Sequence, residues 1–358
     1  MRLAFYAPMK PPDHAVASGD RQMAQSLVLA LQYIGAKVTL ASRLRSRDGA
    51  GDTATQRQLS AAAAAEIPAL IAQGRAEGWQ AWITYHNYYK APDLLGPAVA
   101  GALSIPYLQV ESTRSRSRLT GPWAAFAKAA EAASDAADAI FYLTARDAET
   151  LRRDAPPGQR LIHLPPFLTL SELPAAADLD GPMLCVGMMR AGDKLASYRI
   201  IADTLALLPR DSWQLQIAGD GPERAAVGAL MGRFGTAVHL LGALDAAEMA
   251  RVYGQSSLLF WPGVNEAFGM VYLEAAASGL PIVAQDRPGV RDVLPPAPHP
   301  APDAGASALA ARLAGLNSDA AARQHEGAAA RAQVAARHLM LQAAATLARG
   351  LADCGVHG

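Results

Sequence analysis

The 358-residue chain has only two cysteines and no net charge. Cys185 and Cys354 are far apart and lack metal-ligand spacing, so neither a disulfide framework nor a cysteine-based metal site is expected. Cys185 lies in an apolar run and is predicted to be a small core residue. The chain carries 32 basic and 32 acidic residues, a balance that argues against a dedicated nucleic-acid-binding protein, which usually has a basic excess.

Long apolar segments are also lacking. No stretch of about 18 uninterrupted apolar residues occurs, so no membrane-spanning helix is predicted. The first apolar run ends at Pro8 and has neither the apolar core nor the cleavage site of a secretion signal. These absences predict a cytoplasmic protein, for which any contact with the inner face of a membrane would be peripheral. The high content of Ala, Arg and Gly is typical of a GC-rich bacterial genome.

Hydrophobic residues are plentiful, at 51% of the chain, and short apolar runs alternate with helical patterns from beginning to end. This alternation predicts an α/β fold with parallel strands joined by right-handed crossovers. The helical pattern that follows the first run stops at Gly35, a residue that tolerates the positive φ common at helix ends. The predicted strands cover residues 3–7, 37–41, 81–85, 106–110, 139–143, 161–164, 183–186, 214–218, 238–241, 258–261 and 281–284.

The pattern divides into two doubly wound, Rossmann-like domains that are expected to face each other across a cleft. We predict a first domain over 1–170, a linker over 171–182, and a second domain over 183–335. The linker is rich in Pro, Ala and Asp and shows no periodicity. A C-terminal helix, 336–358, could pack back on the first domain. In doubly wound sheets ligands bind at the carboxyl ends of the strands, so those ends are the places to search for chemistry.

The most informative segment covers residues 260–284, where a strand, a loop, a helix and a further strand follow one another. Glu266 precedes the predicted helix and Glu274 lies about two turns along it, with seven residues between the two glutamates. The first turn of a helix has free N–H groups that can hold a diphosphate, and Gly269 allows close backbone approach. Glu274 could accept two hydrogen bonds from a ribose diol. From spacing alone, an ordinary helix with two solvated acids has about even odds.

This segment resembles the Glu-x7-Glu signature of retaining glycosyltransferases of family 4, which have the GT-B fold. The resemblance implies sugar transfer from a nucleotide-sugar donor without a metal or other cofactor, an acceptor-binding first domain and a donor-binding second domain. It implies that Glu266 is catalytic and that Phe268, Gly269, Met270 and Glu274 bind the donor. The residues that carry the resemblance are Glu266-Ala-Phe268-Gly269 and Glu274-Ala-Ala-Ala-Ser-Gly279-Leu-Pro281-Ile-Val283.

Two cations follow the first strand of the second domain. The family has a strand ending in Val-Gly-Arg followed by a Lys, and these cations neutralise the phosphates of the donor. This sequence has Met188 at the usual Arg position, so the resemblance assigns the catalytic cations to Arg190 and Lys194. An isolated pair of this kind would more often be a solvated basic loop.

Glycines mark two further turns of the second domain. The turn at Gly219 and Gly221 resembles an architectural Gly-x-Gly-Pro turn of the family. The loop at Gly242 resembles the one that contacts the nucleobase through backbone groups. The letters Asp178-Leu-Asp180 resemble a metal motif, but they lie in the predicted linker rather than at a strand end and are discounted.

The first domain departs more from the family. Ala17-Ser18-Gly19-Asp20 occupies the place of a glycine-rich phosphate loop, with Gly19 as a donor-binding candidate at the start of a helix. His86 and Tyr88 follow a predicted strand and are candidates for acceptor or sugar binding, with packing of a domain face as an equal alternative. Glu111 stands where many relatives have a His near the transferred sugar, so it joins these candidates.

Three alternating arginines, Arg114, Arg116 and Arg118, follow the strand at 106–110. They could meet an anionic lipid or a phosphorylated acceptor at a membrane. A flexible, solvated loop is the more frequent meaning of such a charge run, at about two to one.

The sequence leaves several alternative functions open. A nucleotide-sugar epimerase or a phosphorylase could have the same fold, although the paired glutamates weigh against both. A nucleotide-sugar-binding scaffold without activity is kept open by Met188 and Glu111, which replace the usual family residues. A nicotinamide dehydrogenase is disfavoured because no Gly-x-Gly-x-x-Gly follows the first strand. The expected partners are a nucleotide-sugar donor and an unidentified saccharide or lipid-linked acceptor, without nucleic acid.

Overall fold

The computed structural model describes residues 1–16 and 18–357, and the chain forms two compact units. Unit 1 comprises Met1–Pro165 together with Met340–Gly358, and unit 2 comprises Pro166–Leu339. Ala17, the first residue of the predicted phosphate loop, lies outside the described residues.

Unit 1 is built on a parallel sheet of six strands in the order β2-β1-β3-β4-β5-β6. The inner strands β1, β3, β4 and β5 have buried side chains on both faces because helices cover the sheet on each side, whereas the edge strands β2 and β6 are only partly buried. The strand order reverses direction between β1 and β3, and this switch point is where doubly wound sheets place ligands. The strands are β1 Arg2–Tyr6, β2 Lys37–Ser42, β3 Ala81–Tyr85, β4 Tyr107–Val110, β5 Ala139–Tyr142 and β6 Arg160–His163.

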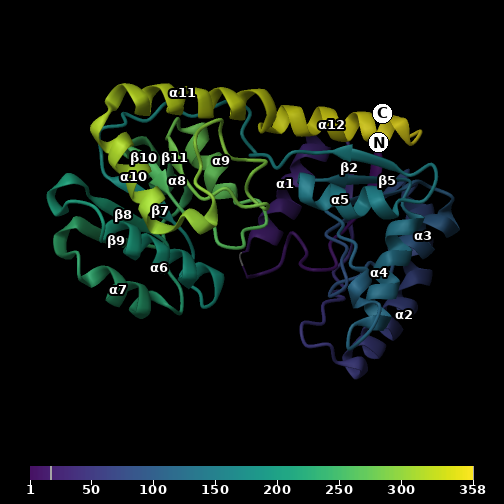
Figure 1. The fold of residues 1–358 in the computed structure, drawn as a ribbon. Helices are drawn as coiled ribbons and strands as arrows, with labels where there is room; N and C mark the ends of the chain where they lie inside the picture. Colours follow the sequence, from purple (N-terminus) through teal and green to yellow (C-terminus); the bar gives the residue numbers. More distant parts are fainter. Residues whose placement is uncertain (17, 358) are drawn as a thin grey trace. The chain divides into compact units, whose positions relative to one another are not determined.

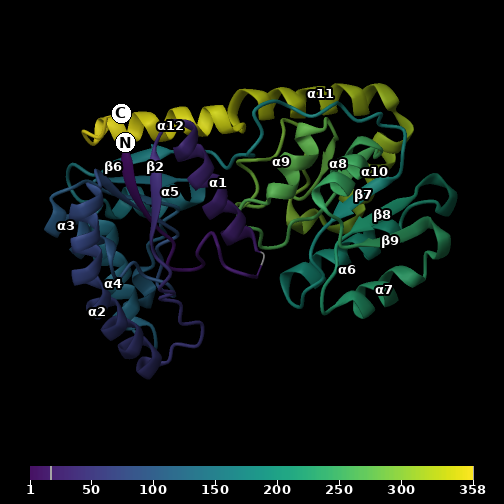
Figure 2. The same ribbon diagram turned by 180° about the vertical axis from the view of Figure 1, so that it is seen from behind.

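The helices of unit 1 include one from the far end of the chain. Helix α12 packs on α1 and extends along the sheet (Figure 1, Figure 2). A Cβ atom at Gly350 of α12 would lie 2.3 Å from Phe141 of β5, so the missing side chain allows close contact. The helices are α1 Gly19–Tyr33, α2 Thr53–Glu77, α3 Gly96–Leu103, the 3₁₀ helix η1 Arg116–Arg118, α4 Ala124–Ala136, α5 Ala145–Asp154 and α12 Met340–Asp353.

Unit 2 has a parallel sheet of five strands in the order β11-β10-β7-β8-β9. Helices α6 and α7 lie on one face, and α8 and α9 lie on the other (Figure 1). The order reverses between β7 and β10, so the loops after these two strands are neighbours. The strands are β7 Met183–Val186, β8 Leu215–Ala218, β9 Val238–Gly242, β10 Leu258–Phe260 and β11 Ile282–Val283. The helices are α6 Asp193–Leu205, α7 Arg224–Gly232, α8 Ala246–Gly254, α9 Met270–Ala277, α10 Gly305–Ser318 and α11 Ala320–Arg337, with 3₁₀ turns at Arg210–Ser212, Gly235–Ala237 and Pro302–Ala304.

The segment 171–182, predicted as a linker, belongs to unit 2 in the structure. Its backbone is tied to that unit, because Ala177 N–H donates to Ser278 O and Asp178 N–H donates to Gly254 O. The change of unit instead occurs between Pro165 and Pro166. A segment without periodicity can therefore be held by backbone hydrogen bonds that its composition does not reveal.

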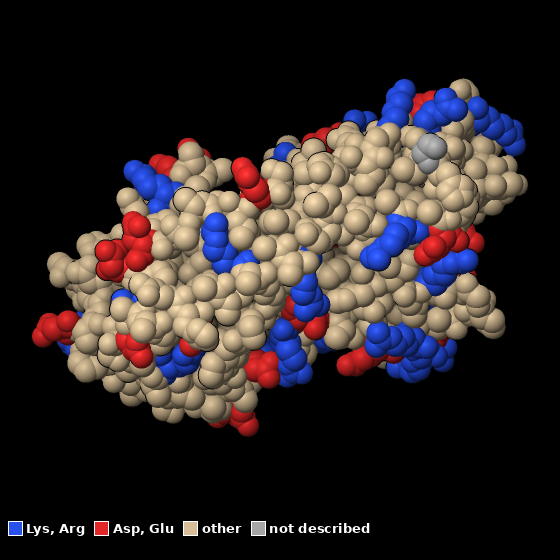
Figure 3. Space-filling model, turned by 90° about the horizontal axis from the view of Figure 1, so that it is seen from above, with Lys and Arg blue, Asp and Glu red and all other residues tan. Residues whose placement is uncertain are grey.

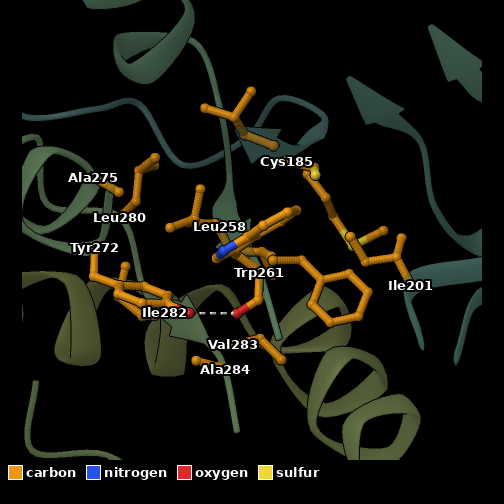
Figure 4. Close-up of a cluster of buried hydrophobic side chains, with 14 of the residues drawn as sticks. Cys185, Ile201, Leu258, Trp261, Tyr272, Ala275, Leu280, Ile282, Val283 and Ala284 are labelled. Carbon is orange, nitrogen blue, oxygen red and sulfur yellow. Dashed lines mark hydrogen bonds between the residues drawn. The ribbon is translucent and has the colours of Figure 1, made fainter. Parts of the chain in front are cut away.

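A buried aromatic pair supports the loop that follows β10 (Figure 4). Tyr272 of α9 donates its hydroxyl hydrogen to the carbonyl oxygen of Trp261 at 3.0 Å, and both side chains are fully buried. Trp261 also contacts Tyr198 of α6 edge-on, with 5.4 Å between ring centroids. Helix α6 thus contacts the ring of Trp261 and helix α9 contacts its carbonyl oxygen, so both helices hold the residue at which the loop after β10 begins.

Candidate active site

Lys194 and Glu266, the residues predicted to be catalytic, are in direct contact. The Lys194 ammonium donates a hydrogen bond to Glu266 Oε1, and the indole N–H of Trp261 donates to the same oxygen at 2.9 Å. Lys194 Nζ also lies 5.3 Å from the centroid of the Trp261 ring. Both charged side chains are largely buried, with 23% and 15% of their surface exposed. Trp261 therefore contacts both members of the ion pair, Glu266 through its indole N–H and Lys194 through its ring. These contacts add to the charge attraction and restrict the movement of the two side chains.

The loop after β10 is anchored to the start of α6. The Asn265 side chain donates to Asp193 Oδ2 at 2.8 Å, and Val264 N–H donates to Ser197 Oγ at 3.2 Å. Asn265 has a φ of 51°, a left-handed conformation that Asn tolerates better than most residues. A Cβ atom at Gly289 would lie 2.0 Å from Glu266 O, so another chain segment supports this loop from behind.

Gly269 caps the amino end of α9 with a φ of 72°. Among the described residues, no side chain caps this helix end. Tyr272 N–H donates to Gly269 O at 3.0 Å, which leaves the N–H groups of Met270 and Val271 to meet an anion. A Cβ atom at Gly269 would lie 2.6 Å from the Tyr272 ring, which explains the need for glycine here. Phe268 and Met270 flank Gly269 and are half-buried. All three predicted donor-binding residues thus lie at one helix end.

Glu274 lies on α9 and accepts a hydrogen bond from the hydroxyl of Tyr253 at 2.9 Å. Burial raises the pKa of Glu274, and the hydrogen bond from Tyr253 lowers it by less. The second carboxylate oxygen is not used by this contact. The carboxylate is therefore oriented by Tyr253 while it can still accept hydrogen bonds from a ligand.

Arg190 and Met188 lie in the loop after β7, and both side chains are exposed. The intervening Met189 is buried and forms backbone hydrogen bonds in both directions, from Met189 N–H to Asp220 O and from Glu223 N–H to Met189 O, each 2.9 Å long. The predicted architectural turn therefore holds this loop. Cβ atoms at Gly219 and Gly221 would lie 2.0 Å from Gly187 O and 2.3 Å from Met189 O.

Gly242, a donor-binding candidate, ends β9 with a φ of 77°. Its carbonyl oxygen accepts a hydrogen bond from Gly219 N–H at 2.7 Å. Because Gly242 ends β9, it lies at the same carboxyl edge of the sheet as the residues after β7 and β8. It is half-buried there.

In unit 1, His86 is held by Asp20 across the switch point of the sheet. His86 follows β3 and Asp20 lies in the first turn of α1, and His86 Nδ1 is 3.0 Å from Asp20 Oδ1. Burial lowers the pKa of His86, but the charge of Glu111 and the hydrogen bond to Asp20 outweigh it, so the pKa is raised overall. Gly19 precedes Asp20 and is exposed, and beyond its own chain neighbours no heavy atom of the described residues lies within 4 Å of where its Cβ would be.

Glu111 follows β4, next to His86 on the same sheet edge. Burial raises the pKa of Glu111, and the charge of His86 and a hydrogen bond with Tyr85 lower it by less. Its Oε2 atom is buried and has no hydrogen-bond partner within residues 1–16 and 18–357. Glu111 has a φ of 56° and His86 a φ of 66°, so both are held in the sparsely populated left-handed region. Strain of this kind clusters at functional sites.

Tyr88 contacts both His86 and Met9. Its ring centroid lies 4.9 Å from that of His86, and its hydroxyl lies 3.8 Å from Met9 Sδ. Burial raises the pKa of Tyr88 to about 12. The sequence analysis did not single out the roles of Asp20, Trp261 or Tyr253, because their importance depends on contacts between elements distant in the sequence.

The three arginines after β4 do not form a free cationic segment. Arg114 is buried and forms ion pairs with Glu131 at 3.0 Å and Asp135 at 2.7 Å. Arg116 pairs with Asp154 at 3.0 Å. The interpretation of these residues as a flexible, solvated loop is therefore wrong for Arg114, and only Arg118 lacks a carboxylate partner among the described residues.

One cavity of unit 2 lies away from the residues predicted to bind the donor. A cavity of about 560 Å³ in unit 2 is lined by residues that precede β7, β8, β9 and β10, including Pro182, Gln214, Ala237 and Ser257. This is the amino edge of the sheet, whereas ligands of doubly wound sheets bind at the carboxyl edge. In the part of the chain that the structure describes, no group of three or more His, Cys, Asp or Glu side chains could hold a metal ion.

No helix among the described residues is both long and apolar enough to span a membrane. In the view of Figure 3, basic and acidic side chains intermingle on a mostly uncharged face. That face therefore has no broad patch of a single charge.

Comparison with protein families finds a match within the second half of the chain. Residues 182–319 match the family described as Glycosyl transferases group 1. A GDP-mannose-dependent alpha-mannosyltransferase from Mycolicibacterium smegmatis is 35% identical over 103 residues, which are 29% of this chain and 26% of that protein. A sulfoquinovosyl transferase from Arabidopsis thaliana is 32% identical over 99 residues, 28% of this chain and 19% of that protein. The chain thus spans between about a fifth and a quarter of the length of these relatives.

Solved structures resemble the whole chain at low sequence identity. A sucrose-phosphate synthase from Thermosynechococcus elongatus has a TM-score of 0.73 and 18% identity, with 98% of both chains covered. The Anabaena protein HepE in complex with UDP and glucose has a TM-score of 0.69 and 15% identity, with 99% of this chain and 100% of that chain covered. The chain therefore has the GT-B fold of two Rossmann-like units, which confirms the predicted fold class.

Proposed function

We propose that this chain is a glycosyltransferase that moves a sugar from a UDP- or GDP-sugar to a saccharide, lipid or other acceptor, with retention of anomeric configuration and without a metal. The contact of Lys194 with Glu266 beside the uncapped end of α9 carries the proposal. The segment that holds these residues is also the one that matches a glycosyltransferase family. In a bacterial cell such an enzyme would serve glycoconjugate or polysaccharide synthesis.

Unit 2 would bind the diphosphate of the donor. Lys194 and the exposed Arg190 supply two positive charges, and the first-turn N–H groups of α9 at Gly269 supply hydrogen-bond donors. Together they offset the negative charge that develops on the leaving nucleoside diphosphate, a role that a metal ion has in other transferases.

The nucleoside would lie further along the same edge. Glu274, oriented by Tyr253, is placed to accept hydrogen bonds from both ribose hydroxyls. The backbone at Gly242 is the candidate contact for the base, and Phe268 and Met270 provide apolar surface beside Gly269. In this arrangement, each predicted donor-binding residue of unit 2 contacts one part of the donor.

The transfer step needs no protein nucleophile. The acceptor hydroxyl oxygen forms a bond to the anomeric carbon while the bond from that carbon to the leaving phosphate oxygen breaks. The hydroxyl proton passes to the leaving phosphate. Glu266 would position the donor sugar and stabilise positive charge at the anomeric carbon, once Lys194 turns toward the diphosphate.

Unit 1 would recognise the acceptor or the transferred sugar through His86, Tyr88 and Glu111. Because the buried Glu111 Oε2 has no partner, a ligand hydroxyl or amino group could donate to it. Gly19, exposed at the start of α1, would contact a phosphate. Glu111 accepts hydrogen bonds where many relatives have His, so the sugar handled here would present a donor group at this point.

A nucleotide-sugar-binding scaffold without activity is the second candidate. Met188 favours it, because an exposed methionine occupies the place where the family has an arginine. Such a protein would bind the nucleotide without releasing it from the sugar.

A donor panel separates these two functions. The purified protein is mixed with UDP-, GDP- and ADP-sugars, and thermal stabilisation and released nucleoside diphosphate are measured in parallel. Stabilisation with release by one donor supports the transferase, while stabilisation without release for every donor and a panel of acceptors supports the scaffold. If no nucleotide sugar stabilises the protein, the donor site in unit 2 is refuted.

A further inference from the structure

Two cations and two aromatic rings gather at the carboxyl edge of the unit 1 sheet, and the proposed function leaves them without a role. Tyr89 and Lys90 follow β3, Arg118 ends the 3₁₀ helix after β4, and Trp123 is the cap residue of α4. We call these four residues the cation–aromatic cluster.

Each cation of the cluster lies over both rings. Lys90 Nζ is 5.6 Å from the Tyr89 centroid and 5.3 Å from the Trp123 centroid. Arg118 Cζ is 5.1 Å from Tyr89 and 5.7 Å from Trp123. The two rings meet edge to face at 5.8 Å. The electron-rich ring faces attract both cations and hold them in one place.

The positive charges of the cluster are not neutralised. No ion pair joins Lys90 or Arg118 to a carboxylate within the described ranges, unlike the paired Arg114 and Arg116. The common ring contacts place the two charges within roughly 11 Å of each other, a separation close to the Debye length at 0.1 M salt. Because this is the largest separation that the shared ring contacts allow, an anion between the two cations could interact with both.

The Trp123 ring is fixed by its surroundings rather than free in solvent. Its indole N–H donates to Asp48 O at 3.2 Å. Gly51, with a φ of 76°, packs so closely on this segment that a Cβ atom would lie 2.5 Å from Pro122. A preorganised ring lowers the entropy cost of ligand binding.

A row of rings connects the cluster with the acceptor candidates. The ring centroids of His86 and Tyr88 are 4.9 Å apart, and those of Tyr88 and Tyr89 are 5.5 Å apart. The row therefore runs from a buried polar group that can hold a hydroxyl to a pair of unneutralised cations. Sites that combine aromatic faces with a few polar groups orient small ligands in this way.

We propose that the cation–aromatic cluster binds an anionic group, such as a phosphate or carboxylate, carried by the saccharide acceptor. The inference rests on the proposed function in one respect, which is that the ligand is an acceptor. The cations select the negative charge, the rings pack against the apolar face of the sugar, and the hydroxyl to be modified lies toward His86. A neutral saccharide would lack the first of these interactions.

Tryptophan fluorescence can test this site selectively. Trp123 is half-exposed, whereas Trp79, Trp82, Trp213 and Trp261 are buried. The full chain is titrated with glucose 1-phosphate and, separately, with glucose at low salt. We expect a saturable change for the phosphate ester, at least about tenfold tighter than for glucose, because charge-assisted hydrogen bonds are the stronger ones. Trp123→Phe should abolish the signal.

The decisive comparison uses two double variants with the same change of charge. Lys90→Gln/Arg118→Gln should weaken glucose 1-phosphate binding by about tenfold or more. Lys37→Gln/Arg75→Gln removes two exposed cations near the opposite edge of the sheet and should leave binding unchanged. Equal affinity for glucose, or equal loss in both double variants, would overturn the proposal. Thermal unfolding of each variant verifies that it folds.

Two further arms separate the sources of the anion and the two proposals. If the cluster retained the protein on phosphatidylglycerol-containing vesicles but not phosphatidylcholine vesicles, and no glucose 1-phosphate bound, a membrane surface would replace the sugar-borne anion and overturn the inference.

Donor binding by unit 2, measured in the same samples, tests the proposed function independently. If the donor binds and glucose 1-phosphate does not, only the inference fails. If glucose 1-phosphate binds and no donor does, the acceptor role fails with the proposed function.

Discussion

Lys194 donates a hydrogen bond to Glu266 although the two residues lie 72 positions apart in the sequence. They meet because β7 and β10 are neighbours in the sheet, so the loops after these strands share one edge. The ammonium and the carboxylate neutralise each other in this contact. In the proposed mechanism, donor binding would require Lys194 to exchange part of this contact for the diphosphate.

Replacement of Lys194 tests the role of its charge. We expect Lys194→Met to lower kcat for nucleoside diphosphate release by about a hundredfold or more, as for the loss of one group that stabilises transition-state charge. Arg199→Met is the matched control, since Arg199 is an exposed cation on the same helix. Steady-state kinetics measure both. Equal activity of Lys194→Met and the wild type would remove Lys194 from the mechanism.

Glu274 should affect nucleotide binding more than chemistry. Glu274→Gln keeps one acceptor oxygen but loses the negative charge, so we expect nucleoside diphosphate affinity to fall about tenfold, equivalent to about 1.4 kcal/mol. Tyr253→Phe removes the orienting hydroxyl and should have a smaller effect in the same direction. Calorimetric titration gives both affinities. Unchanged affinity in Glu274→Gln would separate this carboxylate from the nucleotide.

The sequence was a good guide where structure depends on local pattern. All predicted strands occur, because apolar runs bounded by turn residues are recognisable one at a time. The pairing of Lys194 with Glu266 and of His86 with Asp20 was not predicted, because it depends on which strands become neighbours. The C-terminal helix was expected to pack back on the first domain, and α12 does belong to unit 1, but its contact with α1 depends on packing between the two ends of the chain. Periodicity alone contains no information on either.

Gly269 should be essential for the shape of the α9 amino end. Gly269→Ala combines a left-handed φ with a Cβ atom 2.6 Å from the buried Tyr272 ring, so we expect a loss of about 1–3 kcal/mol of stability. Gly228→Ala is the control. Gly228 lies inside α7, and a Cβ atom there would lie 3.9 Å from Leu240 Cδ1, an ordinary contact, so this variant should be more stable by about 0.5–1 kcal/mol. Denaturant unfolding compares them. A neutral Gly269→Ala would show that the loop relaxes freely.

The group around His86 predicts a pH dependence of stability. The pKa of His86 is raised in the folded protein, with Glu111, Asp20 and Asp147 as the facing charges. The folded state therefore binds this proton more tightly, and the stabilisation is complete below about pH 6.5 and lost as the pH rises through the folded value. The raised pKa of Glu111 acts in the same direction, because its ionisation costs stability.

Thermal unfolding between about pH 6 and pH 9 measures this effect, in a range where the lowered pKa of Asp20 keeps that carboxylate ionised. His86→Asn is the matched variant, since Asn tolerates the left-handed backbone. We expect the unfolding temperature of the wild type to fall toward high pH and that of His86→Asn to change less. Parallel curves for the two proteins would assign the pH dependence to other groups.

Release of a nucleoside diphosphate in the presence of EDTA tests the central claim most directly. The wild type is incubated with the nucleotide sugar that stabilises it and with a panel of saccharide acceptors, beside Lys194→Met and Arg199→Met. We predict acceptor-dependent release that EDTA does not reduce, that Lys194→Met nearly abolishes and that Arg199→Met preserves. Release that stops with EDTA and returns with a divalent metal, or that Lys194→Met leaves intact, would contradict the proposed mechanism.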